Sequence, residues 1–420
     1  MVSNHQRKVL VIGTVFPEPN SSAAGSRMLQ LIAIFKQQGD EVTFASIAND
    51  SDFMINLTEL GINKVSIKLN DDSFDAFVKA LNPKIVLFDR FITEEHFGWR
   101  VNENCPAALR ILDTEDLHCL RAARQKAYKT KEKFETLDLL TEETAKREIA
   151  SILRCDLSLM ISTYEMQILN DVFKISNHSL LYLPFMLPSI TDVEQKQWKK
   201  FEDKSDFVFI GNFLHEPNYQ AVLCLKNEIW PIIHATLPHA KMKIYGAYPS
   251  LKVTQLQQEK QGFYVMGRAT DVNEVMQNAR VNLAPLPFGA GLKGKLIDSM
   301  MNGTPNVSTS IAAEAMQQDL NWSGYITDDL KDFAKKAIEL YQNQEKWELF
   351  RQNGVKIINQ NFNKTFWTDV FVERLNKIEE DLVTHRKFNF FGNLLIQNQY
   401  NACKFMSKWI EEKNKSINNK

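Results

Sequence analysis

The sequence predicts an α/β protein built from two doubly wound parallel sheets. Continuous apolar runs alternate with segments of helical periodicity through both halves of the chain. A proline-interrupted, polar stretch from Pro184 to Glu194 separates the halves. A length of 420 residues, 44% of them hydrophobic, is sufficient for two cores. The predicted domains are residues 1–190 and 191–362, followed by C-terminal helices and a tail at 363–420.

The first half begins with a buried strand. Lys8 to Gly13 reads KVLVIG, an unbroken apolar run of the kind found in parallel sheets. A loop then leads into an amphipathic helix that ends at Gly39. The further strands predicted in this half are Glu41–Ile47, Lys64–Leu69, Lys84–Asp89, Ala108–Asp113, Asp156–Ile161 and Leu180–Leu183.

Polar residues gather where two of these strands end. The loop from Pro17 to Arg27 contains Gly25, and the second cluster runs from Asp113 through Asp116 to His118. Ligands bind at the carboxyl ends of parallel strands, so both clusters are candidates to line a cleft. The alternative is structural, because acidic residues commonly cap helices and a histidine can be an ordinary surface residue.

The most informative stretch lies in the second half, at residues 284–305, which read APLPFGAGLKGKLIDSMMNGTP. An apolar strand at 281–286 is broken by prolines and by Gly289 and Gly291. Apolar residues then return at helical spacing from Leu292. The helix stops at the Asn-Gly-Thr-Pro sequence that begins at Asn302. This order predicts a strand, a Gly-rich turn and a helix.

Such a turn suits an anion. Free amides at the helix start and the positive end of its dipole favour a diphosphate, and Lys293 and Lys295 add charge there. Asp298 follows Lys295 by three residues, so both share one helical face and the carboxylate can accept hydrogen bonds from a ribose diol. These residues predict a nucleotide-sugar site. Gly-rich turns are also frequent in α/β proteins, so an ordinary solvated helix start is the alternative.

Four strand-plus-loop blocks carry a family resemblance. They read FVFIGNFLHEPNYQAVLCLKNEIWPII from 207, LPHAKMKIYGAYP from 237, YVMGRATDVNEVMQNARVNLAPL from 264, and GAGLKGKLIDSMMNGTPNVSTSIAAEAM from 289. In order and spacing they resemble the C-terminal domain of retaining GT-B glycosyltransferases, the group 1 or family-4-like transferases of bacterial polysaccharide synthesis. The resemblance implies two Rossmann-like domains facing across a cleft, with C-terminal helices returning to the first domain.

The resemblance also implies roles for individual residues. Asp298 corresponds to the second Glu of the family's paired-Glu motif, which holds the donor ribose, and Lys295 to a basic residue near the diphosphate that takes part in catalysis. The first Glu position is occupied by Ala290. His118 is then expected to contact the donor sugar or its phosphate from the side opposite Lys295.

Further residues are expected in the same cleft. Gly211 and Asn212 stand in the loop that approaches the donor phosphates. The Arg and Lys that many members carry after that strand are missing, and Lys293, Lys295 and Arg268 are expected to compensate. The remaining cleft residues, placed on the acceptor side, are Gly25, Arg27, Asp113 and Asp116.

The implied activity is transfer of a sugar, with retention, from a nucleotide-diphosphate donor to a glycan or lipid-linked acceptor. The donor is a co-substrate, and neither a cofactor nor a metal is expected, because the helix dipole and the lysines neutralise the leaving diphosphate. One alternative is a non-catalytic nucleotide-sugar binding protein that lost activity with the first Glu. Another, a phosphosugar epimerase, would need an acidic constellation that the sequence does not supply.

The composition of the chain excludes several functional classes of protein. A net charge of −1 argues against a nucleic-acid binder. Five scattered cysteines without metal-ligand spacing suit a reducing cytoplasm. Neither a signal peptide nor a membrane span is expected, because charge leads directly into a strand at Lys8 and apolar runs are short. The expected location is cytoplasmic, with the inner face of the membrane as a peripheral site.

The tail from Arg386 to Lys420 differs from the rest of the chain in its composition. It contains seven Lys and Arg residues against two Glu, an excess of five, interleaved with aromatic residues. A basic, aromatic-rich helix can lie on an anionic membrane surface. The commoner arrangement is a terminal helix packed on the body, and we expect that arrangement here.

Overall fold

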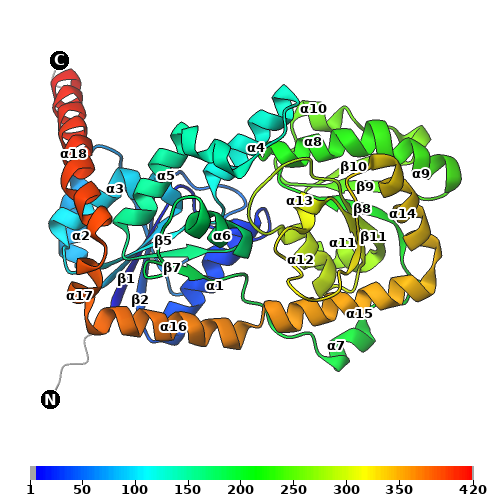
Figure 1. The fold of residues 1–420 in the computed structure, drawn as a ribbon, viewed down its shortest axis with the longest axis horizontal. Coiled ribbons are helices and arrows are strands. Elements are labelled where there is room, and N and C mark those ends of the chain that lie inside the picture. The colour runs from blue at the N-terminus through cyan, green and yellow to red at the C-terminus, as the bar shows by residue number, and fades with distance from the viewer. Residues whose placement is uncertain (1–5, 419–420) are drawn as a thin grey trace.

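The structure, a computed structural model, describes residues 6–418. Residues 1–5 and 419–420, the outermost parts of the predicted first domain and tail, lie outside the described residues. Two parallel sheets stand side by side, each covered by helices on both faces (Figure 1). The predicted α/β class with two doubly wound sheets is therefore confirmed.

The first sheet has seven parallel strands in the order β3-β2-β1-β4-β5-β6-β7. The predicted strand at residues 8–13 is β1, and the other six predictions each match a strand to within a few residues. The strands are β1 (Lys8–Gly13), β2 (Glu41–Ser46), β3 (Asn63–Ser66), β4 (Ile85–Asp89), β5 (Leu109–Asp113), β6 (Leu157–Met160) and β7 (Leu180–Tyr182).

Helices connect these strands on both faces of the sheet. They are α1 (Ala23–Gln37), α2 (Ser73–Leu81), α3 (Arg90–Asn104), α4 (His118–Thr130), the short η1 (Thr136–Thr141), α5 (Glu143–Arg154) and α6 (Thr163–Asp171). In β1, Leu10 and Ile12 pack into one core while Val9 and Val11 pack into the other. Burial on both faces explains why this strand is apolar throughout.

The second sheet has six parallel strands in the order β10-β9-β8-β11-β12-β13. They are β8 (Ser205–Ile210), β9 (Met242–Tyr245), β10 (Phe263–Gly267), β11 (Ala279–Ala284), β12 (Asn306–Ser308) and β13 (Gly324–Ile326). The helices around it are α7 (Asp192–Gln197), α8 (Glu216–Cys224), η2 (Leu225–Ile229), α9 (Trp230–Thr236), α10 (Leu251–Thr254), η3 (Glu259–Gln261), α11 (Val272–Asn278), α12 (Gly294–Met301), α13 (Ser310–Ala313), α14 (Leu330–Gln342) and α15 (Gln344–Asn361).

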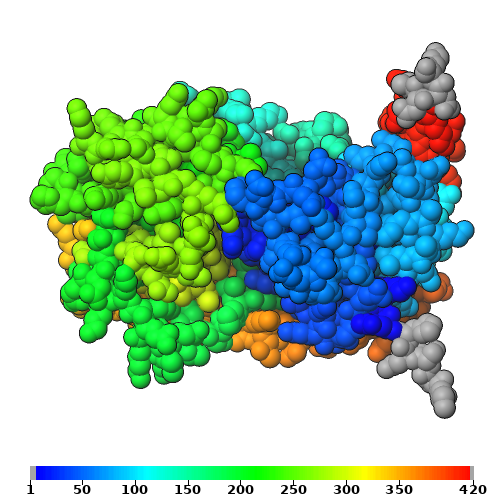
Figure 2. Space-filling model, turned by 180° about the vertical axis from the view of Figure 1, so that it is seen from behind, coloured from blue at the N-terminus to red at the C-terminus, as the bar shows by residue number. Residues whose placement is uncertain are grey.

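The chain crosses between the two sheets twice, and the two crossing segments are joined by backbone hydrogen bonds. The amide of Leu187 donates to the carbonyl of Phe362 at 2.7 Å, and the amide of Lys364 donates to the carbonyl of Leu187 at 2.9 Å. The two domains meet across the middle of the molecule, as the blue and green surfaces show in Figure 2.

The C-terminal helices return to the first domain, as expected. They are α16 (Lys364–Glu380), α17 (Leu382–Lys387) and α18 (Phe390–Asn418). Phe371, Leu375 and Ile378 of α16 enter the core that lies against β1, and α18 packs on α3 and α5 (Figure 1). Among the helices of residues 6–418, none combines the length and the apolar character needed to cross a membrane.

Candidate active site

A cavity of about 910 Å³ lies between the two domains. Its walls come from the segments that follow β1, β5, β8 and β11, that is, from the carboxyl ends of strands in both sheets. Parallel α/β sheets bind their ligands at this edge. The predicted site residues that line the cavity are Asp116, His118, Gly211, Asn212, Arg268, Gly289, Gly291, Lys293, Lys295 and Asp298.

The Gly-rich turn between β11 and α12 is pressed against the first domain. Gly291 has a φ of +64°, and a Cβ added there would lie 2.9 Å from Cβ of Asp116. A side chain would therefore be strained by the left-handed backbone and would also clash with the facing loop. Glycine at this position lets the two domains approach.

Both glycines of the turn are bonded to the first domain. The Gly291 amide donates to Oε1 of Glu165 at 2.7 Å, and Arg124 donates to the Gly289 carbonyl at 2.8 Å. Arg124 also forms an ion pair with Glu314 at 2.7 Å. The Gly291 amide hydrogen is thus already donated within the protein, and the expectation that Gly289 and Gly291 bind the donor stays a prediction. The turn works as a contact between domains.

The start of α12 meets the start of α1. A Cβ added at Gly294 would lie 2.6 Å from Cβ of Ala23, and Ser21 and Ser22 line the cavity next to it. The positive ends of two helix dipoles thus face one cavity, a combination that favours an anionic ligand.

Lys295, in the first turn of α12, is held by an amide. Its Nζ donates to Oδ1 of Asn218 at 2.6 Å and lies 4.8 Å from the ring centre of Phe209. Burial, with a smaller contribution from the charge of Lys293, lowers the pKa of Lys295 to about 7. The ammonium is therefore close to its titration point near neutral pH.

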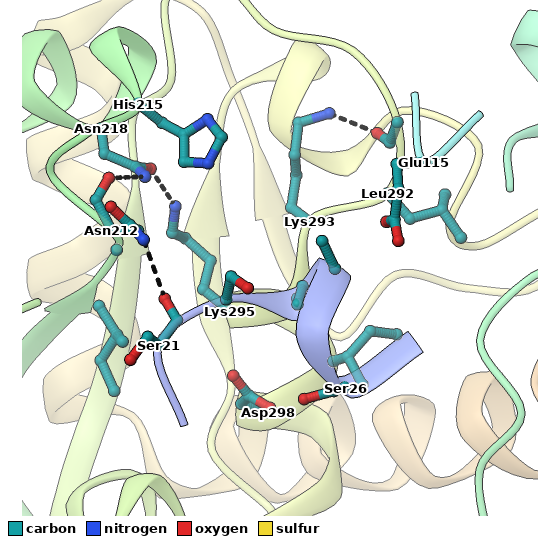
Figure 3. A pocket seen from close by; sticks show the side chains of 18 of the residues that line it. Ser21, Ser26, Glu115, Asn212, His215, Asn218, Leu292, Lys293, Lys295 and Asp298 are labelled. Atoms are coloured by element: carbon teal, nitrogen blue, oxygen red, sulfur yellow. Dashed lines mark hydrogen bonds between the residues drawn. The ribbon is translucent and has the colours of Figure 1, made fainter. Parts of the chain in front are cut away.

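Asn218 continues this network into the segment after β8. Its Nδ2 donates to the carbonyl of Asn212 at 2.7 Å, and Nδ2 of Asn212 donates to the carbonyl of Ser21 at 3.3 Å. Figure 3 shows these bonds joining Lys295 to the first domain. Gly211 has to be small, because an added Cβ would lie 2.7 Å from Asn218.

Lys293 differs from its neighbour. Its Nζ donates to the carbonyls of Ala290 at 3.0 Å and Gly291 at 2.5 Å, so the side chain bends back onto its own turn (Figure 3). Burial lowers its pKa to about 8. The expectation that Lys293 supplies mobile charge is corrected, because its ammonium is buried and braces the Gly-rich turn.

Asp298 and Arg268 line other parts of the cavity. Burial, partly opposed by the charge of Lys295, raises the pKa of Asp298 to about 7. Figure 3 shows its side chain next along α12 from Lys295, three residues further into the helix, and Ser26 of α1 lines the same cavity. The guanidinium of Arg268 lies 4.4 Å from the ring centre of Phe53 in the first domain.

His118 begins α4 on the opposite wall. Its Nδ1 lies 3.2 Å from the carbonyl oxygen of Asp116 and 3.3 Å from Oε1 of Glu148. Glu148 also accepts the backbone amides of His118 and Cys119, which satisfies the start of the helix. Because oxygens occupy the Nδ1 side, the other ring nitrogen, Nε2, is the one available to a ligand.

The carboxylate of Asp116 is already paired. It forms an ion pair with Arg121, and its pKa is lowered because Arg121 and His118 together outweigh the effect of burial. Next to it, Glu115 lines the cavity with a φ of +62° and a buried Oε1 that has no partner among the described residues. Burial, reinforced by the charge of Asp113, raises the pKa of Glu115 well above its usual value.

Three residues expected on the acceptor side do not line the cavity. Arg27 and Asp113 form an ion pair at 2.9 Å with both side chains 0% exposed, and Arg27 also donates to the carbonyl of Leu183 at 2.7 Å. Gly25 is a packing residue, since a Cβ there would lie 2.6 Å from the backbone of Glu18. These predictions are corrected. Arg27 and Asp113 join α1 to β5, and Gly25 lets α1 pack against the loop that precedes α1.

The site has further residues that the sequence did not single out: Asn218 lines the cavity, while Glu165 and Arg124 bond to the Gly-rich turn from the first domain. Asn218, Glu165 and Arg124 had no recognisable motif, because each acts on a partner distant in the sequence. His215, immediately before α8, also lines the cavity. Burial, helped by the charge of Arg121, lowers its pKa to about 4.

Within residues 6–418, His, Cys, Asp and Glu side chains do not gather in groups of three or more that could hold a metal ion. The expectation of metal-independent chemistry stays a prediction.

Comparisons with known proteins point to one family. Residues 204–343 match the family model described as Glycosyl transferases group 1. An uncharacterized 44.6 kDa protein in the cps region of Klebsiella pneumoniae is 23% identical over 202 residues, which cover 46% of this chain and 51% of that protein. The chain thus spans about half the length of the curated relative that it matches.

Solved structures resemble the whole fold. Sucrose-phosphate synthase from Thermosynechococcus elongatus has a TM-score of 0.68 at 13% identity, covering 89% of this chain and 99% of that one. HepE from Anabaena, in complex with UDP and glucose, has a TM-score of 0.62 at 13% identity, covering 89% and 100%. Residues 204–343 of the second domain thus match the group 1 glycosyl transferases, and the chain as a whole has the GT-B fold of these proteins.

Proposed function

We propose that this protein transfers a sugar from a nucleotide-diphosphate donor to a glycan or lipid-linked acceptor, with retention at the anomeric carbon. One observation carries the proposal: the start of α12, the ammonium of Lys295 and the carboxylate of Asp298 line the same cavity, within one turn of helix. A structure of similar fold, Anabaena HepE, is a complex with UDP and glucose, which supports a nucleotide sugar as donor.

The donor is placed by charge and hydrogen bonding. The diphosphate lies at the start of α12, where backbone amides and Lys295 meet it, and the facing start of α1 adds a second positive helix end. Asp298, one turn deeper, accepts hydrogen bonds from the ribose diol. Arg268 and Asn212 line the same cavity and are the further residues proposed to contact the nucleotide.

In the transfer, the bond between the anomeric carbon and the diphosphate oxygen breaks, and a bond to the acceptor oxygen forms. The acceptor hydroxyl loses its proton, and the nucleoside diphosphate leaves with the bonding electrons. Negative charge therefore grows on the diphosphate, where Lys295 and the helix amides stabilise it most strongly. His118 contacts the sugar or its phosphate from the opposite wall through Nε2.

The alternative proposal is a nucleotide-sugar binding protein without activity. Ala290 favours it, since no carboxylate occupies that position of the turn. Incubation with a panel of nucleotide sugars, followed by saturation-transfer NMR and by assay of donor hydrolysis, distinguishes the two. Binding with release of free nucleoside diphosphate supports a transferase. Binding with no release under any acceptor condition supports the alternative, and no binding at all contradicts both.

A further inference from the structure

The C-terminal helix α18 has two different faces. Its inner face is bonded to the first domain: the hydroxyl of Tyr400 donates to Oε1 of Glu94 at 2.6 Å, and Arg100 donates to Oγ of Ser407 at 3.0 Å and pairs with Glu411. These side chains are buried. The expected packing of the tail on the body is thereby confirmed.

The outer face carries large apolar side chains. Phe391 and Trp409 each lie nine residues from Tyr400, which at 100° per residue is about half a turn away from the buried face. Five large apolar residues on this side are between 44% and 69% exposed, and we call them the outer stripe: Phe391, Leu394, Phe405, Met406 and Trp409. Phe388 and Phe390, at the start of the helix, are exposed too. Scattered exposed apolar residues are common, but a stripe of this kind marks an interaction surface.

Basic side chains accompany the outer stripe. Nζ of Lys413 lies 5.4 Å from the ring centre of Trp409, and among residues 6–418 neither Lys413 nor Lys387, the last residue of α17, forms an ion pair. Lys404 and Lys415 form pairs that are partly or largely open to solvent. Such pairs are weak and exchange readily with other anions.

We infer that the outer stripe docks on an anionic lipid surface. Aromatic rings flanked by lysines suit the headgroup region, where rings bury their apolar parts while ammonium groups meet lipid phosphate. A second copy of the chain is a poorer occupant, because it would bring the same lysines together, and lysine is depleted from protein interfaces. The helix stands at the end of the first domain that is remote from the second domain and projects beyond the body (Figures 1 and 2), so a flat surface can reach it.

This inference goes beyond the proposed function, since docking requires no nucleotide sugar. The test uses the full-length protein and sedimentation with two kinds of vesicle, phosphatidylcholine alone and phosphatidylcholine mixed with phosphatidylglycerol. We expect binding to the mixed vesicles at low salt and release at high salt, because the attraction is partly electrostatic.

The decisive variant is Phe405→Glu/Trp409→Glu, which we expect to weaken vesicle binding by about tenfold or more. Its matched control is Leu251→Glu/Leu349→Glu, which changes two leucines that are 79% and 57% exposed on other helices and leaves binding unchanged. A second variant, Lys387→Glu/Lys413→Glu, leaves all apolar side chains in place and should also reduce binding. It carries the test if the first variant does not fold.

Three results would overturn the inference. The first is a full-length protein that ignores mixed vesicles at low salt. The second is equal loss of binding in the outer-stripe variant and in its control. The third is a dimer, seen by analytical ultracentrifugation, that the Phe405→Glu/Trp409→Glu variant dissolves while vesicles are not bound. Nucleoside diphosphate binding, measured in parallel, separates failure of this inference from failure of the proposed function.

Discussion

Nζ of Lys295 lies 2.6 Å from Oδ1 of Asn218, so the lysine predicted for the anion site is held by an amide from α8. The same amide donates to the carbonyl of Asn212. The start of α12 and the segment after β8 are therefore fixed relative to each other at the cavity. Asn218 is a neutral acceptor, and a diphosphate is a stronger one for an ammonium.

Lys295→Ala is expected to weaken binding of a nucleoside diphosphate by about 1.5–3 kcal/mol, the value of a charge-assisted hydrogen bond. Calorimetric titration with UDP checks this. The control is Lys293→Ala, because Nζ of Lys293 bonds to the carbonyls of its own turn. That variant should lower the melting temperature, while its affinity for UDP should change much less than that of the Lys295 variant. Equal affinity of the Lys295 variant and the wild type would remove Lys295 from the site.

The affinity for UDP is expected to fall as the pH rises above about 7. Burial lowers the pKa of Lys295 to about 7, so below that pH the ammonium is already charged, and above it binding has to take up a proton. Calorimetry at about pH 8 in buffers of different ionisation enthalpy measures this uptake.

The pKa of Asp298 is raised to about 7 as well, so this carboxyl titrates in the same range. Measurements in an Asp298→Asn background isolate the contribution of Lys295. Lys295→Met in that background should then bind UDP without the additional proton uptake. Undiminished uptake in the double variant would assign the proton to another group.

Asp298→Asn is expected to reduce the preference for an intact ribose diol, since an amide accepts hydrogen bonds less strongly than a carboxylate. The measurement compares the affinities of UDP and its 2′-deoxy analogue in the wild type and in the variant. The ratio should move toward one. If both affinities fell by the same factor, Asp298 would support the helix and have no contact with the ribose.

Arg27→Met is expected to destabilise the first domain by about 3–5 kcal/mol, because it leaves the carboxylate of Asp113 buried without its partner. Urea unfolding measures the loss, and replacing both residues in Arg27→Met/Asp113→Leu should recover much of it. A single variant as stable as the wild type that lost only acceptor transfer would restore Arg27 to the acceptor side.

The sequence was sufficient to predict those parts of the structure that depend on a local pattern of residues. Parallel strands buried on both faces are continuous apolar runs, and for this reason Lys8–Gly13 could be predicted to the residue. The order of strand, Gly turn and helix likewise located Lys295 and Asp298 at the cavity.

Contacts between distant residues could not be predicted. Arg27 and Asp113 were correctly assigned to one sheet edge, but charged residues are usually exposed, and their burial depends on a partner 86 positions away. The bond from the Gly291 amide to Glu165 spans 126 positions and leaves no signal in either segment. The tail was expected to pack on the body, and α18 does so, but the pattern did not reveal which of its large apolar side chains stay exposed on the outer face.

His118→Ala is expected to lower turnover by about a hundredfold while changing UDP affinity little, because a residue of the facing domain acts on the sugar as charge develops.

Two further variants identify the atom responsible. Nδ1 of His118 faces the carbonyl of Asp116 and the carboxylate of Glu148, which leaves Nε2 for the ligand. The amide of His118→Gln reaches near the position of Nε2, and that of His118→Asn reaches near Nδ1. Turnover should therefore be higher in the Gln variant than in the Asn variant. The reverse order would mean that the ring serves to hold the start of α4, and unchanged turnover in His118→Ala would make the histidine a structural residue of the cleft wall.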